Sequence, residues 1–422
     1  MLEINRIKAE KSELIERLKV RNFDATTIFN DLLTLDEKWR ETKTELDKIS
    51  AESNKIAKEI GMLFGQGKVE EANKAKDKTA NLKEKSKTLT QQVNELANLI
   101  TQKLYEIPNI PHPSVPAGNS DEDNEIVFED APKQNLPKNA LPHWELAKTY
   151  NLIDFELGVK VTGAGFPFYI GKGARLQRAL INFFLDEARD AGYKEIIPPF
   201  VVNEASGYGT GQLPDKEGQM YHCQVDDLYL IPTAEVPLTN MFRDVILKNE
   251  DFPIKITGYT PCFRREAGSY GKHVRGLNRL HQFDKVEIVR VEHPNDSYGV
   301  LDEMVAYVES LLKKLELPYR KLRLCGGDIG FTSALTYDLE VYSAAQERWL
   351  EVSSISNFET FQANRLKLRF KDENKKNRLA HTLNGSALAL PRILASILEN
   401  NQTEKGINIP KVLIPYTGFD KI

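Results

Sequence analysis

Two matching apolar seams in the first quarter of the chain most constrain what this sequence can fold into. In both, apolar or small side chains recur at alternating steps of three and four, the spacing that places them on one side of an α-helix. A cluster of glycines over residues 61–67 separates the two series. We therefore predict an antiparallel two-helix coiled-coil arm over about residues 29–104, with limbs ~50 Å long at 1.5 Å rise per residue. The first seam comprises Leu32, Leu35, Trp39, Thr42, Leu46, Ile49, Ser53, Ile56 and Ile60, and the second comprises Ala72, Ala75, Thr79, Leu82, Ser86, Leu89, Val93, Leu96 and Ile100.

The outer face of the second limb is rich in lysine. Only Asp77 and Glu84 oppose the lysines of residues 74–87. A solvated helix face is the common meaning of such a run, but a rigid basic arm can also follow a phosphate backbone. The pattern by itself leaves both interpretations open. The lysines are Lys74, Lys76, Lys78, Lys83, Lys85 and Lys87.

The overall composition excludes several classes of protein. The formal net charge of the 422 residues is −4, so nucleic-acid binding must come from local basic patches. No DNA partner is expected. The three cysteines are far apart and form no CxxC pair, which argues against a disulfide framework or a zinc site and favours a reducing compartment. The charged N-terminus and the lack of an 18-residue apolar run predict a soluble, cytoplasmic protein with no membrane partner.

Proline marks the boundary between two regions of the chain. Residues 107–142 hold seven of the twenty prolines, which is typical of an extended connection between domains. We predict an N-terminal domain over residues 1–106, a Pro-rich linker over 107–142 and a larger domain over 143–422. Within the linker, only residues 125–129 favour a strand.

The larger domain mixes short β-rich runs with a few amphipathic segments, which favours an α+β fold built on a mainly antiparallel β-sheet flanked by helices. Neither GxGxxG nor GxxxxGK[ST] occurs in the sequence, so a Rossmann or P-loop nucleotide site is not supported. We predict strands at residues 194–202, 228–231, 254–260, 282–291, 322–324, 338–342 and 349–355, and helices at 173–191, 237–247, 297–315 and 387–400.

Residues 261–290 have the pattern of two strands joined by a long, basic, glycine-rich loop. Structural hairpins usually need only two to five loop residues. Basic side chains and exposed backbone donors suit a polyphosphate ligand, and here Lys272, His273, Arg275 and Arg279 supply the charge. A solvated surface hairpin is the alternative interpretation.

Three further segments, residues 230–237, 351–356 and 381–392, carry many polar side chains. The first places Thr233 and Glu235 at the head of a predicted helix, and the last runs from a polar turn into an apolar helix. Each segment alone is more often helix capping, turn chemistry or satisfied core polarity.

Together, these segments resemble the bacterial-type seryl-tRNA synthetases over essentially the whole chain. FRREAG and GLNRLHQFDKVE are similar to the second signature motif of class II aminoacyl-tRNA synthetases, and TLNGSALALPR is similar to the third. Residues 173–202 resemble the first motif, which builds the dimer interface in that class. IPTAEVPLTN and EVSSISNFETFQANR are similar to serine-specific segments. The departures are Arg265, where the family often has serine, and Ala387, Ala389 and Pro391, where the class prefers glycine.

The resemblance implies that ATP activates L-serine to an enzyme-bound seryl-adenylate with release of diphosphate. Serine is then transferred to the 3′ end of tRNA(Ser), and the family suggests tRNA(Sec) as a second acceptor. It further implies a homodimer whose arm binds tRNA, which favours the functional interpretation of the lysine-rich face. Mg²⁺ bound with ATP is the implied cofactor, and no zinc is expected.

The resemblance also assigns roles to individual residues. Arg264, Glu266 and Arg392 are the implied catalytic residues. The implied serine-binding residues are Thr233, Ala234, Glu235, Arg264, Glu287, Asn384 and Ser386. The implied ATP-binding residues are Arg264, Arg265, Glu266, Arg279, Leu280, Phe283, Glu351, Val352, Ser353, Ser354 and Arg392, and Glu351 and Ser354 would also ligate Mg²⁺.

Two other functions compete with this interpretation. A synthetase-like paralogue could load a carrier protein instead of tRNA, but we expect such a relative to lack the long arm. A non-catalytic RNA-binding coiled-coil protein would be expected to have lost some of the charged residues Arg264, Glu266, Glu351 and Arg392. The arm and all four residues are present.

Overall fold

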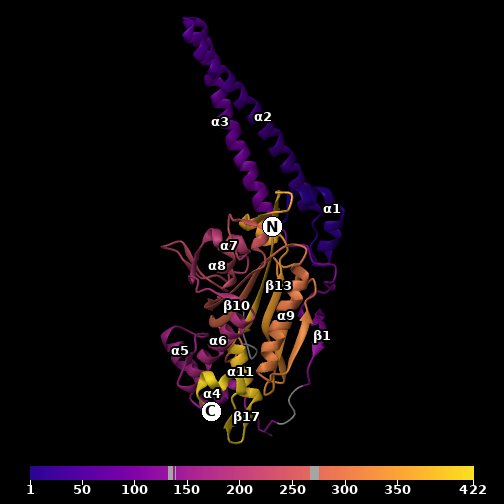
Figure 1. The fold of residues 1–422 in the computed structure, drawn as a ribbon, viewed down its shortest axis with the longest axis vertical. Helices are drawn as coiled ribbons and strands as arrows, with labels where there is room; N and C mark the ends of the chain where they lie inside the picture. The colour runs from indigo at the N-terminus through magenta and orange to yellow at the C-terminus, as the bar shows by residue number, and fades with distance from the viewer. Residues whose placement is uncertain (132–135, 138, 267–274) are drawn as a thin grey trace. The chain divides into compact units, whose positions relative to one another are not determined.

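The computed structural model describes residues 1–131, 136–137, 139–266 and 275–422 (Figure 1). These form two compact units. One comprises Leu2–Lys19 and Phe23–Pro108, and the other comprises Met1, Val20–Asn22 and Asn109–Ile422. Within the described ranges, no helix is both long enough and apolar enough to cross a membrane.

The smaller unit is helical and contains α1 (Ile4–Lys19), α2 (Thr26–Gly65) and α3 (Val69–Tyr105). Helices α2 and α3 pack against each other along their length (Figure 1). Every predicted seam residue is buried or half-buried, which confirms the coiled-coil arm. The polar member Thr79 is satisfied within the seam, because its hydroxyl donates to the carbonyl oxygen of Ala75 at 2.8 Å.

The turn at the end of the arm is tighter than the glycine cluster predicted. Helix α2 continues to Gly65, and Gly67 then turns the chain with a φ of +76°, in the left-handed region that favours glycine. The amide of Lys68 donates to the carbonyl oxygen of Leu63 at 3.0 Å. This bond closes the helix end in the manner of a Schellman motif, so only three residues separate the two helices.

An eight-stranded sheet forms the centre of the larger unit, with the strand order β1-β11-β12-β13-β16-β10-β9-β4. All neighbouring strands are antiparallel except β4 and β9, which confirms the mainly antiparallel sheet. The strands are β1 (Glu125–Glu129), β4 (Lys194–Glu195), β9 (Ile254–Phe263), β10 (Gln282–Glu292), β11 (Tyr319–Arg323), β12 (Leu335–Ser343), β13 (Arg348–Asn357) and β16 (His381–Ala389).

The central strands have one apolar face, and three long helices pack against the sheet. Val286 and Ile288 of β10 and Ile355 of β13 belong to the main hydrophobic core. Successive side chains of a strand point to opposite faces, so Glu287 and Ser356 lie on the other side. The helices that contribute to this core are α6 (Lys172–Asp190), α9 (Ser297–Lys314) and α11 (Leu390–Asn400).

Shorter elements complete the larger unit. The remaining α-helices are α4 (His143–Thr149), α5 (Phe155–Val161), α7 (Glu204–Thr210), α8 (Glu235–Asn240), α10 (Phe361–Leu366) and α12 (Ile414–Thr417). The small sheets are built from β2 (Ile153–Asp154), β3 (Phe168–Tyr169), β5 (Val201–Asn203), β6 (His222–Cys223), β7 (Leu228–Leu230), β8 (Ile246–Lys248), β14 (Arg369–Lys371), β15 (Asn377–Leu379), β17 (Gln402–Thr403) and β18 (Gly406–Ile407).

Three predicted elements of the larger unit are wrong in part. The helix predicted over residues 237–247 ends at Asn240, because the chain then forms β8, which pairs with β14. The strand predicted over 194–202 divides into β4 and β5, in two different sheets, because two prolines in its middle remove ladder donors. The segment 381–392 is a central strand through Ala389 rather than a polar turn, so α11 starts three residues later than predicted.

Candidate active site

Three neighbouring strands bring polar side chains to one face of the large sheet. Residues directly opposed in an antiparallel pair point to the same side. Glu287 of β10 is paired with Ser386 of β16, and Asn384 of β16 is paired with Ser356 of β13. Phe283 lies four residues before Glu287 on the same strand and therefore shares its face. The sheet thus gathers residues predicted to bind serine beside one predicted to bind ATP.

A buried ion pair lies on this face. The Nζ of Lys285 is 2.5 Å from Oε2 of Glu287, and it donates to the hydroxyl of Thr233 at 2.8 Å. The same hydroxyl donates to Oε2 of Glu287 at 3.2 Å. The side chains of Lys285 and Glu287 are only 7% and 2% exposed, so water screens their attraction weakly. Two predicted serine-binding residues from separate segments therefore meet around a lysine.

Glu235, the first residue of α8, supplies a second buried carboxylate near this pair. Its Oε1 accepts a hydrogen bond from Nε2 of Gln362 at 2.6 Å. Burial, and then the negative charge of Glu287, raise the pKa of Glu235 to about 7, while Gln362, Lys285 and a hydrogen bond from Asn384 partly oppose that rise. A carboxyl group that changes charge near neutral pH in such a place is suited to receiving a cation.

Arg264 and Phe283 form a cationic and aromatic platform. The guanidinium carbon of Arg264 lies 5.2 Å from the ring centroid of Phe283, within the range of a cation–π contact. The Nε of Arg264 donates to the carbonyl oxygen of Pro232 at 3.3 Å. The backbone N–H of Arg264 donates to the carbonyl oxygen of His281 at 2.9 Å. These bonds fix a planar fork that pairs well with oxyanions beside a flat apolar ring.

Glu266 and Arg279 form an ion pair at the base of the predicted basic loop. Glu266 has a φ of +50°, and its amide donates to Oε1 of Gln219 at 3.0 Å. The ion pair therefore connects the segment that follows β9 to the segment that leads into β10. Lys272 and His273, predicted as part of the loop's positive charge, lie outside the described residues.

Arg265 points toward a different neighbour from Arg264. Its Nε donates to the carbonyl oxygen of Met220 at 3.2 Å, and its guanidinium carbon lies 5.2 Å from the ring centroid of Tyr221. Four other predicted ligand-contacting residues, Ala234, Leu280, Val352 and Ser353, are packed into the protein. Ala234, Leu280 and Val352 are buried in apolar clusters. The hydroxyl of Ser353 donates to the carbonyl oxygen of Ser386 at 2.6 Å.

Arg392, near the start of α11, is held between two segments. Its Nη1 donates to the carbonyl oxygen of Glu351 at 2.6 Å and lies 3.7 Å from the Oε2 of the same residue. Its Nε donates to the carbonyl oxygen of Asn278 at 3.0 Å. The guanidinium is thus anchored to β13 on one side and to the limb that enters β10 on the other.

A β-bulge directs the two predicted metal ligands to the same side of β13. The register of β12 against β13 shifts by one residue midway, so Glu351 and Ser354 share a face despite their odd spacing. Asp338 is paired with Ser354, and its Oδ1 is buried with no hydrogen-bond partner among the described residues. Burial, and then the charge of Glu351, hold the pKa of Asp338 well above its usual range.

Comparisons with known proteins agree with these observations. Residues 1–111 match the family described as "Seryl-tRNA synthetase N-terminal domain", and residues 221–401 match "tRNA synthetase class II core domain (G, H, P, S and T)". A serine–tRNA ligase from Salinibacter ruber is 51% identical over 424 residues, which cover 100% of this chain and 99% of that protein. The chain belongs to the seryl-tRNA synthetase family.

Two solved structures extend this family relationship to the fold. The crystal structure of seryl-tRNA synthetase from Pyrococcus horikoshii complexed with ATP has a TM-score of 0.90 at 35% identity, covering 100% of this chain and 99% of that one. The cytoplasmic serine–tRNA ligase from Naegleria fowleri in complex with AMP has a TM-score of 0.85 at 29% identity, covering 100% and 98%. The family, fold and enzyme class predicted from the sequence are confirmed.

Three polar residues of this synthetase core were not predicted as part of the site. Lys285 had a usable signal, because strand alternation places it on the same face as Phe283 and Glu287. Gln362 lies within EVSSISNFETFQANR, the segment similar to serine-specific ones, but nothing in that segment singles it out. Asp338 had no signal, since it lies on a strand outside the motifs. Their proximity to the site comes from the tertiary fold.

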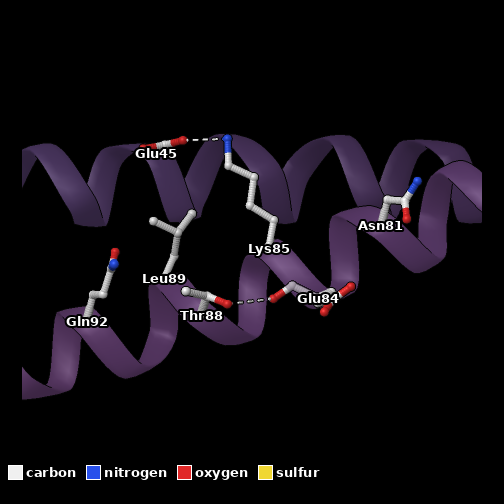
Figure 2. A pocket seen from close by; sticks show the side chains of 7 residues that line it. All are labelled: Glu45, Asn81, Glu84, Lys85, Thr88, Leu89 and Gln92. Atoms are coloured by element: carbon white, nitrogen blue, oxygen red, sulfur yellow. Dashed lines mark hydrogen bonds and ion pairs between the residues drawn. The ribbon is translucent and has the colours of Figure 1, made fainter.

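On the arm of this synthetase, all six predicted tRNA-binding lysines are exposed. Two of them reach across to α2, where Lys78 lies 2.9 Å from Glu52 and Lys85 lies 2.7 Å from Glu45. Figure 2 shows the second pair at a groove between the helices. Surface pairs of this kind are worth about 0–1 kcal/mol, so they hold the two lysines only weakly. The groove is lined by Glu45, Asn81, Glu84, Lys85, Thr88, Leu89 and Gln92.

Proposed function

We propose that this family member activates L-serine with ATP and transfers the serine to the 3′ end of tRNA(Ser). A carboxylate oxygen of serine attacks the α-phosphate and diphosphate leaves. A ribose hydroxyl of the tRNA then attacks the carbonyl carbon and AMP leaves. The first step depends on positioning and electrostatics and needs no protein nucleophile. One observation carries the proposal: acidic and hydroxyl groups suited to a small amino acid share a sheet face with the platform of Arg264 and Phe283.

Serine recognition would use the two buried carboxylates. Glu235 and Glu287 offer negative charge to the substrate ammonium, and Glu287 can also accept from the substrate hydroxyl. Alanine would leave that acceptor unpaired, and pockets built around a substrate hydroxyl reject analogues lacking it by ~10⁴ or more. Threonine must be excluded by fit, a weaker filter worth ~1–3 kcal/mol for one carbon. Ala234, Asn384 and Ser386 would complete the pocket.

ATP would bind across the platform. Arg264 would contact the α-phosphate and the substrate carboxylate, and the ring of Phe283 would stack on the adenine. Arg392 would hold the γ-phosphate end, because arginine forms bidentate pairs with phosphate oxygens. Glu266 would accept from the adenine amino group, and Arg279 would then turn from Glu266 toward the phosphates.

The residues present fit a Mg²⁺ ion that arrives with ATP. Glu351 and Ser354 offer two oxygen ligands on one face of β13, and the unpartnered Oδ1 of Asp338 lies on that face. Mg²⁺ prefers such oxygen ligands and commonly takes the rest of its shell from substrate phosphates and water. When bound, the ion would neutralise phosphate charge and orient the leaving diphosphate.

The proposed assembly is a homodimer in which the arm binds tRNA. Ile197 is 83% exposed, and Phe200 and Val201 beside it are also exposed. Clustered exposed apolar side chains often mark a protein–protein interface. The lysine face of α3 suits recognition of RNA by backbone and shape. We extend the proposal to tRNA(Sec) as a second acceptor and to a cytoplasmic location, which the three free cysteines favour.

A diphosphate-exchange assay tests this function and separates the alternatives. ATP–diphosphate exchange is measured with serine, threonine, alanine and glycine, and aminoacylation is measured with and without total tRNA. We expect exchange with serine and serine-charged tRNA. Exchange without tRNA charging would favour a carrier-loading enzyme, and a folded protein with no exchange would favour a non-catalytic RNA-binding role.

A further inference from the structure

A closed ring of buried hydrogen bonds is centred on Glu399 of α11, which the proposed chemistry does not use. One carboxylate oxygen of Glu399 accepts from the backbone N–H of His143 at 2.9 Å, from its Nδ1 at 2.7 Å and from Nε2 of Gln346 at 3.0 Å. The other accepts from the hydroxyl of Ser343 and from the amide of Ala345. Five groups donate to the two oxygens of Glu399, and hydrogen bonds of this kind stabilise the ionised carboxylate. Glu399 is therefore an anion that orients its neighbours.

The ring of His143, fully buried beside Glu399, has a defined tautomer. Because Nδ1 donates to Glu399, Nε2 of the neutral ring is an acceptor. The backbone N–H of Leu277 donates to that Nε2 at 2.8 Å. Gly276 has a φ of +68°, and a Cβ on it would lie 2.3 Å from the same nitrogen. Glycine therefore allows the backbone to approach the imidazole.

Leu277 belongs to the returning limb, residues 275–280, which leads from the basic loop into β10. The next residue of this limb, Asn278, contacts both Arg392 and the ring. Its carbonyl oxygen accepts from Nε of Arg392 at 3.0 Å, and its Nδ2 donates to Oε1 of Gln346 at 2.8 Å. Gln346 also donates to Glu399. The hydrogen bonds therefore form a closed ring that runs from Glu399 through the His143 imidazole, the returning limb and Gln346 back to Glu399.

The limb is also held on its outer side. Nη2 of Arg275 lies 3.2 Å from Oε1 of Glu145, and its guanidinium carbon lies 4.8 Å from the ring centroid of Trp144. Both partners follow His143 directly on α4. Three consecutive residues of this helix therefore contact the returning limb. The imidazole of His143 makes the buried contact. Trp144 and Glu145 make exposed or half-buried contacts with Arg275.

We propose that His143 is a positioning residue for the nucleotide site. Oriented by Glu399, it fixes the returning limb so that Arg392 is held toward the phosphates of ATP. The inference rests on the proposed role of Arg392 in ATP binding. His143 acts through Leu277 and Asn278 and touches no substrate. A misplacement of about 1 Å in such a group can cost on the order of 10²-fold in rate.

Calorimetric binding of ATP and of serine to the full-length protein tests this role. His143→Gln and His143→Leu should weaken ATP binding about tenfold, while serine binding changes less than about twofold. His381→Gln is the matched control. His381 is also a buried histidine, and its Nδ1 lies 2.7 Å from the side-chain hydroxyl of Ser297. This control should leave ATP affinity unchanged. Equal loss of both ligands in the His143 variants, or an equal effect of the control, would overturn the proposal.

A second set of variants separates this inference from the role of Arg392. Gly276→Ala disturbs the same contact from the limb and leaves the pair of His143 and Glu399 in place, so it should also weaken ATP binding selectively. His143→Leu combined with Arg392→Ala should bind ATP no more weakly than Arg392→Ala alone, because coupled residues are non-additive. Additive losses would overturn the positioning role. Unchanged ATP affinity in Arg392→Ala would overturn the role of Arg392 itself, and the inference with it.

Discussion

Lys285 and Glu287 form an ion pair along β10, with 2.5 Å between Nζ and Oε2 and both side chains buried. The two residues are two positions apart on a strand, so they share a face, and Thr233 bridges them with its hydroxyl. The carboxyl group of Glu235 also lies near Glu287. The positive charge of Lys285 therefore offsets only one of two neighbouring carboxylates. Once Glu235 is ionised, the proposed serine pocket therefore keeps one uncompensated negative charge that can pair with the substrate ammonium.

Removing the lysine should destabilise the protein more than removing the whole pair. Lys285→Met leaves Glu287 buried without its cation, which typically costs about 3–5 kcal/mol. Adding Glu287→Gln removes the uncompensated charge, so the double variant should recover part of the free energy of unfolding. Urea unfolding of the two variants measures this. If the single and double variants are equally stable, Lys285 does not compensate Glu287.

Replacing Arg264 should stop adenylate formation. Arg264→Ala removes the fork held beside Phe283, and loss of one such electrostatic group typically costs about 10²–10³ in rate. Serine-dependent ATP–diphosphate exchange is the measurement. Arg265→Ala is a matched control with the same charge change, and we expect a smaller loss because Arg265 points to Met220 and Tyr221. Near-normal exchange by folded Arg264→Ala would falsify the assignment.

Serine use should depend on pH through Glu235. Because its pKa is raised to about 7, this carboxyl group is mostly protonated below that pH and cannot fully pair with an ammonium. kcat/KM for serine, which reports on groups of the free enzyme, should therefore rise between about pH 6 and 8 and then level off. Glu235→Gln should lower kcat/KM and remove the rise. A rise of the same size in that variant would assign the titration to another group.

The same shift predicts the sign of a stability effect. The pKa of Glu235 in the folded protein lies above its ordinary value of 4.5, so the folded state binds the proton more tightly than the unfolded state does. Its contribution to stability is fully present below pH 4.5 and is lost as the pH rises through about 7. The difference in unfolding free energy between the parent protein and Glu235→Gln should therefore change across this window. A constant difference would contradict the raised pKa.

The sequence predicted the arm in detail because its signal is local and repeated. Each seam residue, such as Leu46 or Leu89, contributes to one period, and the fold adds only the pairing of the helices. Strand β16 was missed because its local signals conflict. Thr382, Asn384 and Ser386 alternate with Leu383, Gly385 and Ala387, but the Asn-Gly pair and the serine at its centre are typical of turns. Its Asn384 and Ser386 suggested a turn until the strand pairing explained them.

The site could be predicted only where its residues lie in contiguous motifs. Arg264, Phe283 and Glu287 stand within one hairpin, and the resemblance identified them together. The ring around Glu399 combines α4, α11, the returning limb and the turn after β12. No spacing within one segment indicates that His143 and Leu277, 134 residues apart, form a hydrogen bond. Such contacts follow from the tertiary fold, which depends on many weak local and packing preferences along the whole chain.

Charge reversal on the arm should weaken tRNA charging without affecting adenylate formation. Lys74, Lys83 and Lys87 are exposed on α3, and replacing all three by glutamate should raise KM for tRNA and reduce its salt dependence, because phosphate contacts set that slope. Lys48, Lys55 and Lys58, exposed on α2, give a control with the same change in charge. The control should have a smaller effect on KM for tRNA. Equal effects in the two triple variants would mean that net charge, and not the lysine face of α3, governs binding.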